Sequence, residues 1–310
     1  MIGRSFSTAR SHAKFLLQFW RTRVFRPRLS PNVGGGVAAR LLKETRRAAF
    51  STYSRMNFAT RALLELQETT LLVAHAARGL FKRPRYVPET IAQMDAIGVG
   101  SLTIIILTGF FTGGVFTLQT FPTLQFYGAQ SQTGRLVALS LVRELGPVLS
   151  ALMVTGRVGS AISAELGSMT VSQQIDAMRA LGTDPVRKLV TPRLLALLVT
   201  LPLLTVIADV VGILGGMVVA LSLYGMSSNM YMSSVWEGVT ADDILGGIIK
   251  PIVFGLIIGS IACHKGLTTE GGTVGVGRST TRSVVSASIV VIIADFFLAR
   301  ALQYILDMPT

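Results

Sequence analysis

Long apolar stretches, separated by short charged segments, dominate the chain from residue 96 onward. The first is an uncharged run from Ala96 to Gly134, and four more apolar stretches follow, broken by a few isolated charges. About 20 apolar residues are enough to cross the hydrocarbon core of a bilayer. The pattern therefore predicts an all-α integral membrane protein with five transmembrane helices, at 91–118, 136–164, 194–223, 244–263 and 283–303.

A different pattern precedes the first span. Over residues 59–81, leucines alternate with charged residues such as Glu65 and Glu68, which makes the segment too charged to span. Such an amphipathic helix is suited to lie in the membrane interface. We therefore expect an interfacial helix within 56–90, ahead of a membrane body over 91–305. The basic cluster that follows this helix comprises Lys82, Arg83 and Arg85.

The net charge of +13 belongs mainly to the amino-terminal segment. Residues 1–55 hold 12 of the 29 basic residues and one of the 16 acidic residues. This uneven distribution argues against a nucleic-acid-binding protein, in which basic residues would cover a folded domain. The segment is an extension outside the fold, and three interpretations stay open: an organellar transit peptide, a disordered basic arm on anionic lipid, or a mis-assigned start upstream of Met56.

The charges of the loops predict the orientation of the chain. Basic residues follow the second and fourth spans, whereas the loop after the first span is neutral and the loop after the third is acidic. Cytoplasmic loops are enriched in Lys and Arg. We therefore expect the amino end and the loops 165–193 and 264–282 to be cytoplasmic, and the carboxyl end to lie outside.

Ionisable residues inside the spans are candidates for function, because they are costly in a membrane. Arg143 and Glu144 lie in the second span and are followed at once by Gly146 and Pro147. Proline removes a backbone donor and kinks a helix, so a kink beside an ion pair suggests the wall of a polar-mouthed cavity. Three further intramembrane charges either pair with one another for structural reasons or take part in transport: Asp209, Lys250 and Asp295.

Two other motifs concern possible partners and ligands. Residues 171–181 in the loop after the second span can form a short cytoplasmic helix with apolar and charged faces. The motif over 272–279 reads G-x-x-x-x-G-R-S, one residue away from a nucleotide-binding loop. That chemistry needs a lysine after the last glycine and a preceding strand. We therefore interpret it as a flexible glycine turn, and the single Cys263 in an apolar span predicts no metal site.

Several motifs together resemble the MlaE-like permease family, the membrane subunits of mammalian-cell-entry (MCE) type ABC transporters. The resemblance covers about residues 60–305. It rests on the runs Leu139-Ser-Leu-Val-Arg-Glu-Leu-Gly-Pro147, Gly156-Arg-Val-Gly-Ser-Ala161, Ala164-Glu-Leu-Gly167, Ala180-Leu-Gly-Thr-Asp-Pro185, Lys250-Pro251 and the glycine-rich 271–282.

The resemblance implies an interfacial helix plus five transmembrane helices, with a coupling helix between the second and third spans. It implies a homodimer that works with a separate ABC ATPase and an MCE-domain protein and moves membrane phospholipids. The chain would then be a non-catalytic subunit without a cofactor, and ATP would be bound by the partner. The implied location is the bacterial inner membrane or, alternatively, the plastid inner envelope.

The resemblance also assigns roles to residues of this chain. The coupling helix falls at about 171–181, with Glu165, Asp176 and Arg179 as expected ATPase contacts. The lipid cavity of the family lies between protomers along the first two spans. By position, the residues expected to line it are Phe116, Leu124, Tyr127, Arg143 and Glu144.

Alternative functions remain at this stage. An ion-coupled secondary carrier could use Asp209, Asp295 and Glu144 as a proton relay, but it usually shows inverted repeats, which the sequence lacks. A scaffold that only anchors an MCE ring would tolerate changes in the kink and the cavity. Sterols or other hydrophobic compounds are alternative cargo in the same ABC architecture.

Overall fold

The computed structural model describes residues 58–80 and 86–305. The expected basic extension over 1–55 and the basic cluster over 82–85 lie outside the described residues. The chain divides into a unit over residues 1–71 and a unit over 72–310, and the first half of helix α3 belongs to the former. The larger unit contains all the predicted spans.

The described residues are almost all helical, and no strand occurs among them. Three short π-helical turns (η2, η3 and η4) and one 3₁₀ turn (η1) interrupt the α-helices. In chain order the elements are α3 (Phe58–Leu80), α4 (Val87–Phe126), η1 (Gln130–Gln132), α5 (Thr133–Ser140), η2 (Leu141–Leu145), α6 (Gly146–Val154), η3 (Thr155–Gly159), α7 (Ser160–Val171), α8 (Gln174–Ala180), η4 (Val186–Val190), α9 (Thr191–Tyr224), α10 (Ser228–Gly238), α11 (Ala241–Leu267) and α12 (Gly272–Ile305).

Five segments in the described part of the chain are long and apolar enough to cross a membrane, which confirms the predicted number of spans. Each includes the predicted stretch and extends beyond it by several residues. The segments are Val87–Phe126, Gln130–Val171, Val186–Tyr224, Ala241–Leu267 and Gly272–Ile305.

Local sequence signals define several helix ends. The Thr240 side chain and the Asp243 carboxylate form a capping box that starts α11, because each satisfies a backbone amide that lacks a partner within the helix. Gly225 ends α9 in the left-handed region, with φ of 64°, where glycine is favoured. The glycine motif over 272–279 is helical, so the interpretation as a flexible turn was wrong. Only Gly271 and Gly272 have positive φ in this connection.

Small residues allow the closest helix crossing in the bundle, between α4 and α9. A Cβ atom on Gly113 would lie 1.8 Å from the Gly212 carbonyl oxygen, and one on Gly215 would lie 2.2 Å from the Phe110 carbonyl oxygen. Backbones can approach this closely only at glycine, and such contacts drive helix association in lipid. The α4–α9 pair therefore forms a rigid wall of the bundle.

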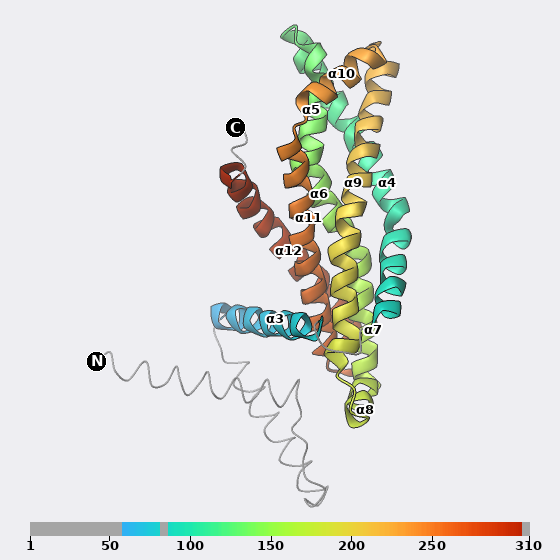
Figure 1. Ribbon diagram of the computed structural model, residues 1–310, viewed down its shortest axis with the longest axis vertical. Coiled ribbons are helices and arrows are strands. Elements are labelled where there is room, and N and C mark those ends of the chain that lie inside the picture. Colours follow the sequence, from blue (N-terminus) through green and yellow to red (C-terminus); the bar gives the residue numbers. More distant parts are fainter. Residues whose placement is uncertain (1–57, 81–85, 306–310) are drawn as a thin grey trace, which may run out of the picture. The chain divides into compact units, whose positions relative to one another are not determined.

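The two ends of the bundle differ. α8 and the connection between α11 and α12 lie at one end, and α5 and α10 lie at the other (Figure 1). The sequence had not predicted α10, which packs through the fully buried Tyr231. The Tyr231 hydroxyl donates a hydrogen bond to the Ile213 carbonyl at 3.2 Å, and burial raises the pKa of Tyr231 above its ordinary value.

Candidate functional site

A cluster of charged side chains joins the second span to α11 and α12. Arg143 Nε donates to Asp243 Oδ1 at 2.5 Å. The Lys250 ammonium lies 2.6 Å from Glu144 Oε2 and 3.2 Å from Asp295 Oδ1. The five charges come from the second span, α11 and α12, which are far apart in the sequence but adjacent in the fold. Four of them are the predicted Arg143, Glu144, Lys250 and Asp295.

The backbone of η2 explains why Lys250 lies there. The Gly146 amide bonds to the Leu141 carbonyl five residues back, and Pro147 has no amide to offer the Arg143 carbonyl. Lys250 Nζ donates to that carbonyl at 2.8 Å. The π turn with its proline thus creates an unpaired acceptor inside the membrane, and a lysine from α11 satisfies it.

Gly247 lets α11 come close enough for these contacts. A Cβ atom at this position would lie 2.7 Å from the Val142 carbonyl oxygen, so any larger residue would push α11 away from η2. Lys250 is only 2% exposed and Asp243 is fully buried, whereas the Glu144 side chain is 45% exposed. The cluster is therefore anchored in the protein and presents a carboxylate at its surface.

Asp209 lies apart from this cluster. A Cβ atom on Gly146 would lie 1.7 Å from Asp209 Oδ1, so the carboxylate packs directly on the start of α6. Asp209 Oδ1 is buried and has no hydrogen-bond partner among the described residues. The intramembrane charges predicted as one set thus divide into a paired group, Lys250 and Asp295, and the separate Asp209.

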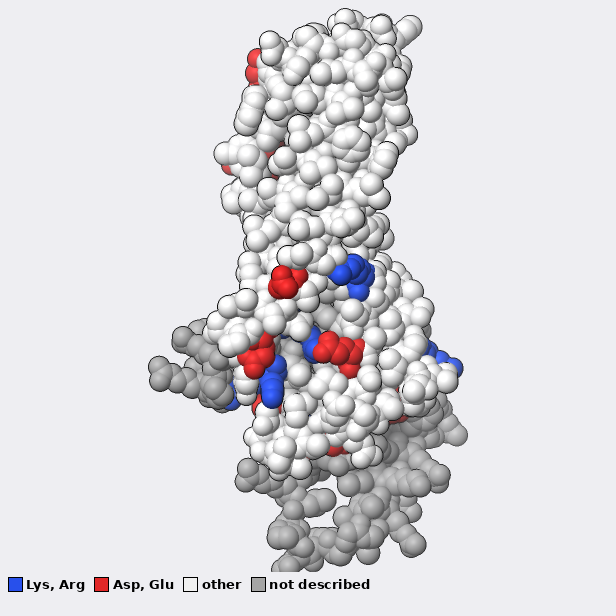
Figure 2. All heavy atoms as spheres, turned by 90° about the vertical axis from the view of Figure 1, so that its right-hand side faces the viewer, with Lys and Arg blue, Asp and Glu red and all other residues white. Residues whose placement is uncertain are grey.

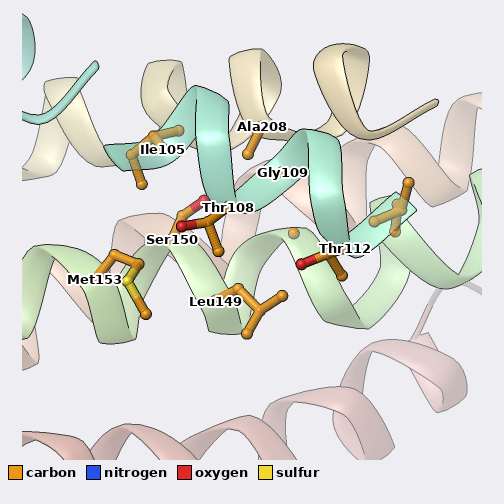
Figure 3. Close-up of a pocket in the computed structure, with 10 residues that line it drawn as sticks. Ile105, Thr108, Gly109, Thr112, Leu149, Ser150, Met153 and Ala208 are labelled. Atoms are coloured by element: carbon orange, nitrogen blue, oxygen red, sulfur yellow. The ribbon is translucent and has the colours of Figure 1, made fainter. Parts of the chain in front are cut away.

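A small pocket lies between α4, α6 and α9 (Figure 3), and α9 contributes Ala208 to its lining. The Ser150 hydroxyl faces it, is buried, and has no hydrogen-bond partner among the described residues. The pocket volume of about 10 Å³ is roughly the room that one water molecule needs. Gly146 is the only predicted site residue that lines it; the other lining residues are Ile105, Thr108, Gly109, Thr112, Leu141, Leu149, Ser150, Met153 and Ala208.

The apolar residues expected to line a lipid cavity all lie on α4 or just after it. Phe116 and Leu124 are half-buried, and Tyr127 is 75% exposed with its ring 5.2 Å from that of Phe126. α4 packs mainly on α9, whereas Arg143 and Glu144 pair with α11. Within one chain, therefore, the structure does not bring the predicted apolar and charged cavity residues into a single enclosed pocket.

The predicted short helix after the second span is present as α8. Arg179 Nη1 donates to Asp176 Oδ1 at 3.2 Å within this helix. Glu165, at the end of the preceding span, lies 2.8 Å from the Arg193 guanidinium at the start of α9. Glu165 is 57% exposed and Arg193 only 3%, so Arg193 fixes the base of the α8 loop and leaves the carboxylate accessible.

The second half of α3, within the larger unit, contacts the segment that follows α8. His75 Nε2 lies 2.9 Å from Asp184 Oδ2, and the Val186 amide donates to the other carboxylate oxygen at 3.0 Å. Burial opposes ionisation of Asp184, but the hydrogen bond and the charge of His75 outweigh it and hold the pKa of Asp184 below its ordinary value. This pair links α3 to the α8 loop.

Sequence reasoning missed some of these residues. Asp243 had been assigned to an acidic outer loop, although the Thr240-x-x-Asp243 capping pattern would have indicated a helix start. His75 was not predicted as a site residue, and in the structure it pairs with Asp184. Its partner Asp184 is far away in the sequence, and nothing local predicts the contact.

Comparisons with known proteins agree with the fold and the motifs. Residues 90–301 match the protein family described as Permease MlaE. The chain is 43% identical to a probable ABC transporter permease protein of Synechocystis, over 68% of this chain and 80% of that protein. It is 39% identical to the intermembrane phospholipid transport system permease protein MlaE of Haemophilus influenzae, over 69% and 82%. It is 37% identical to the chloroplastic protein TRIGALACTOSYLDIACYLGLYCEROL 1 of Arabidopsis thaliana, over 81% and 70%.

Proposed function

The chain belongs to the MlaE permease family, and on that premise we propose that it is the membrane subunit of an ATP-driven transporter that moves phospholipid between membranes. The observation that carries this proposal is the family match over residues 90–301, which reaches into all five spans. The Haemophilus relative is named for phospholipid transport between membranes. Phospholipid is therefore the favoured cargo over sterols, and no comparison favours an ion-coupled carrier.

A separate ABC ATPase would supply the energy in this proposal. The chain would bind no cofactor of its own, and ATP would be held by the partner. α8 lies at one end of the bundle (Figure 1) and carries the partly exposed pair Asp176 and Arg179. Together with the accessible Glu165 carboxylate, this helix is suited to dock on the ATPase.

The lipid cavity would be completed by a second copy of the chain. The pocket between α4, α6 and α9 is too small for an acyl chain, which supports a cavity between protomers rather than within one. Glu144 would present its exposed carboxylate to that space, and Phe116, Leu124 and Tyr127 would contact acyl chains. An MCE-domain protein would receive lipid at the α10 end. The location would be the bacterial inner membrane or the plastid inner envelope.

Reconstitution tests the proposal. The chain is placed in vesicles with the ATPase and MCE-domain proteins of its own organism, and transfer of fluorescent phospholipid to acceptor vesicles is followed. We expect transfer that requires ATP and stops when the ATPase lacks its phosphate-binding lysine. Transfer without ATPase that follows a proton gradient would instead establish the ion-coupled carrier, and competition by sterol but not by phospholipid would establish sterol cargo.

A further inference from the structure

Arg157 is an intramembrane arginine whose guanidinium has a single hydrogen-bond partner among the described residues. It lies in the middle of η3, is exposed, and its Nη1 donates to the Ser101 hydroxyl of α4 at 2.9 Å. No acidic residue of the described chain forms an ion pair with it, and the acidic residues of α4, Glu89 and Asp95, are not among its partners. A guanidinium has five N–H donors, and only one hydrogen bond from this group is formed within the described part of the chain.

The surroundings of Arg157 keep the guanidinium open. A Cβ atom on Gly100 would lie 2.3 Å from Arg157 Nη2, so the absence of a side chain there lets the guanidinium lie flat on α4. Gly156 has no atom within 4 Å of the corresponding position. Both glycines are exposed. The guanidinium therefore lies against the backbone of Gly100 and the Ser101 hydroxyl, and no side chain at Gly100 or Gly156 covers this part of the helix.

Arg157 lies in the second span, between the charged cluster around Lys250 and the α8 end. Residues 145–156 are uncharged, and Arg157 is the first charge after them on the way to the α8 end. It follows Glu144 by roughly 20 Å at 1.5 Å per residue, about two thirds of the hydrocarbon thickness of about 30 Å, so it lies well toward the α8 side of that cluster. On the face drawn in Figure 2, charged side chains gather in the central and lower part, toward α8, and the upper part is almost free of them.

We propose that Arg157, held by Ser101 beside Gly100, is a binding site for the phosphate group of a phospholipid in the leaflet on the α8 side. An arginine binds phosphate oxygens through two parallel N–H bonds, and a bare guanidinium at this depth is costly without an anion. A lipid phosphate arrives at this level with its acyl chains already in the membrane. The role of this site rests on the proposed function. It adds to that function a contact with the lipid headgroup, separate from the charged cluster around Lys250.

Lipid binding to the purified full-length chain tests the site directly. Binding of radiolabelled phosphatidylglycerol is measured in mixed micelles, with diacylglycerol of the same acyl chains as the competitor that lacks phosphate. Arg157→Gln is expected to weaken binding of phosphatidylglycerol about tenfold and to leave that of diacylglycerol unchanged. Arg157→Lys should retain most of the affinity, because a lysine also binds phosphate as a point charge.

Matched controls separate this site from general electrostatics. Arg135 is an exposed arginine at the α10 end of the same span, and Arg135→Gln should leave the affinity for phosphatidylglycerol unchanged. An equal loss in both variants would overturn the proposal, as would equal wild-type affinity for the two lipids.

Displacement by millimolar inorganic phosphate would assign the site to free phosphate, and loss of dimer in Arg157→Gln would assign the arginine to a protein contact. ATP-dependent transfer is measured on the same preparation, so that failure of the transporter function is distinguished from failure of this site.

Discussion

The two π turns of the second span, η2 and η3, place the same residue in the same local setting and use it differently. Arg143 and Arg157 each occupy the third position of a five-residue turn. Arg143 pairs with a fully buried aspartate from α11, whereas the guanidinium of Arg157 donates, among the residues that the structure describes, only to a serine on α4. Each π turn therefore directs an arginine side chain away from its helix. Whether the charge is neutralised within the protein or is available to a ligand depends on the residues of the neighbouring helix.

The two turns also differ in how their backbone carbonyl groups are hydrogen-bonded. At η2, Pro147 leaves a carbonyl without an amide and Lys250 supplies the donor. At η3 no proline follows, and Ser160 Oγ donates to the Gly156 carbonyl. A charged cluster is thus required for the integrity of η2 but not of η3. Substitutions at η2 should therefore reduce the free energy of unfolding more than those at η3 or outside the spans.

The largest effect is expected from Lys250→Met. The substitution leaves Glu144, Asp295 and the Arg143 carbonyl without their shared cation, and breaking a buried ion pair from one side costs about 3–5 kcal/mol. The measurement is thermal unfolding of the detergent-purified protein. Lys188→Met, at an exposed position of η4, serves as the control and should change stability by less than about 0.5 kcal/mol. Equal midpoints for both variants would contradict a structural role of the cluster.

A pair of glycine substitutions compares the packing of the two turns. Gly247→Ala brings a methyl group against the Val142 carbonyl, and such overpacking costs about 1–3 kcal/mol. Gly156→Ala places the methyl group in open space and should be neutral or stabilising by up to about 1 kcal/mol, because alanine favours helix. Unfolding midpoints of both variants are compared with the wild type. If Gly156→Ala lowered the unfolding midpoint and Gly247→Ala left it unchanged, the tighter packing would lie at η3 and not at η2.

A smaller effect is expected outside the spans, where Asp184 pairs with His75. The folded pKa of Asp184 lies below its ordinary value, so the carboxylate contributes stability above the ordinary pKa of about 4. That contribution is lost as the pH falls through the lowered folded pKa. The pair is partly exposed, so its contribution to the free energy of unfolding is less than about 1 kcal/mol. Unfolding between about pH 6 and about pH 3 should show a weaker pH dependence in Asp184→Asn than in the wild type.

The smallest effect on folding is expected from Arg179→Glu in α8. An i,i+3 pair at the surface contributes about 0.5 kcal/mol at most, so membrane insertion and unfolding should change little. In the proposed assembly, charge reversal on α8 would uncouple ATP hydrolysis from lipid transfer, and both rates are measured in the reconstituted vesicles. Normal coupling in this variant would remove the assignment of α8 as the coupling helix.

Hydropathy and charge along the chain were enough to predict the number of spans and the short helix after the second one. A bilayer requires about 20 apolar residues for each crossing, and whether a segment meets this requirement can be seen from its own sequence. Pro147 likewise indicated an interruption of the second span. The position of α10 was not predicted, because its short mixed sequence is stabilised by burial of Tyr231 rather than by a strong local pattern.

The tertiary structure alone decided the partners of the charges. Nothing near Lys250 in the sequence indicates that it satisfies the Arg143 carbonyl, since the two residues are brought together by the close approach of α11 at Gly247. The same holds for Arg143 with Asp243 and for the open position of Arg157. Local sequence determines which segments enter the membrane, because transfer into lipid depends on each segment's own composition. Pairing depends on distances between helices, and these are set by packing across the whole bundle.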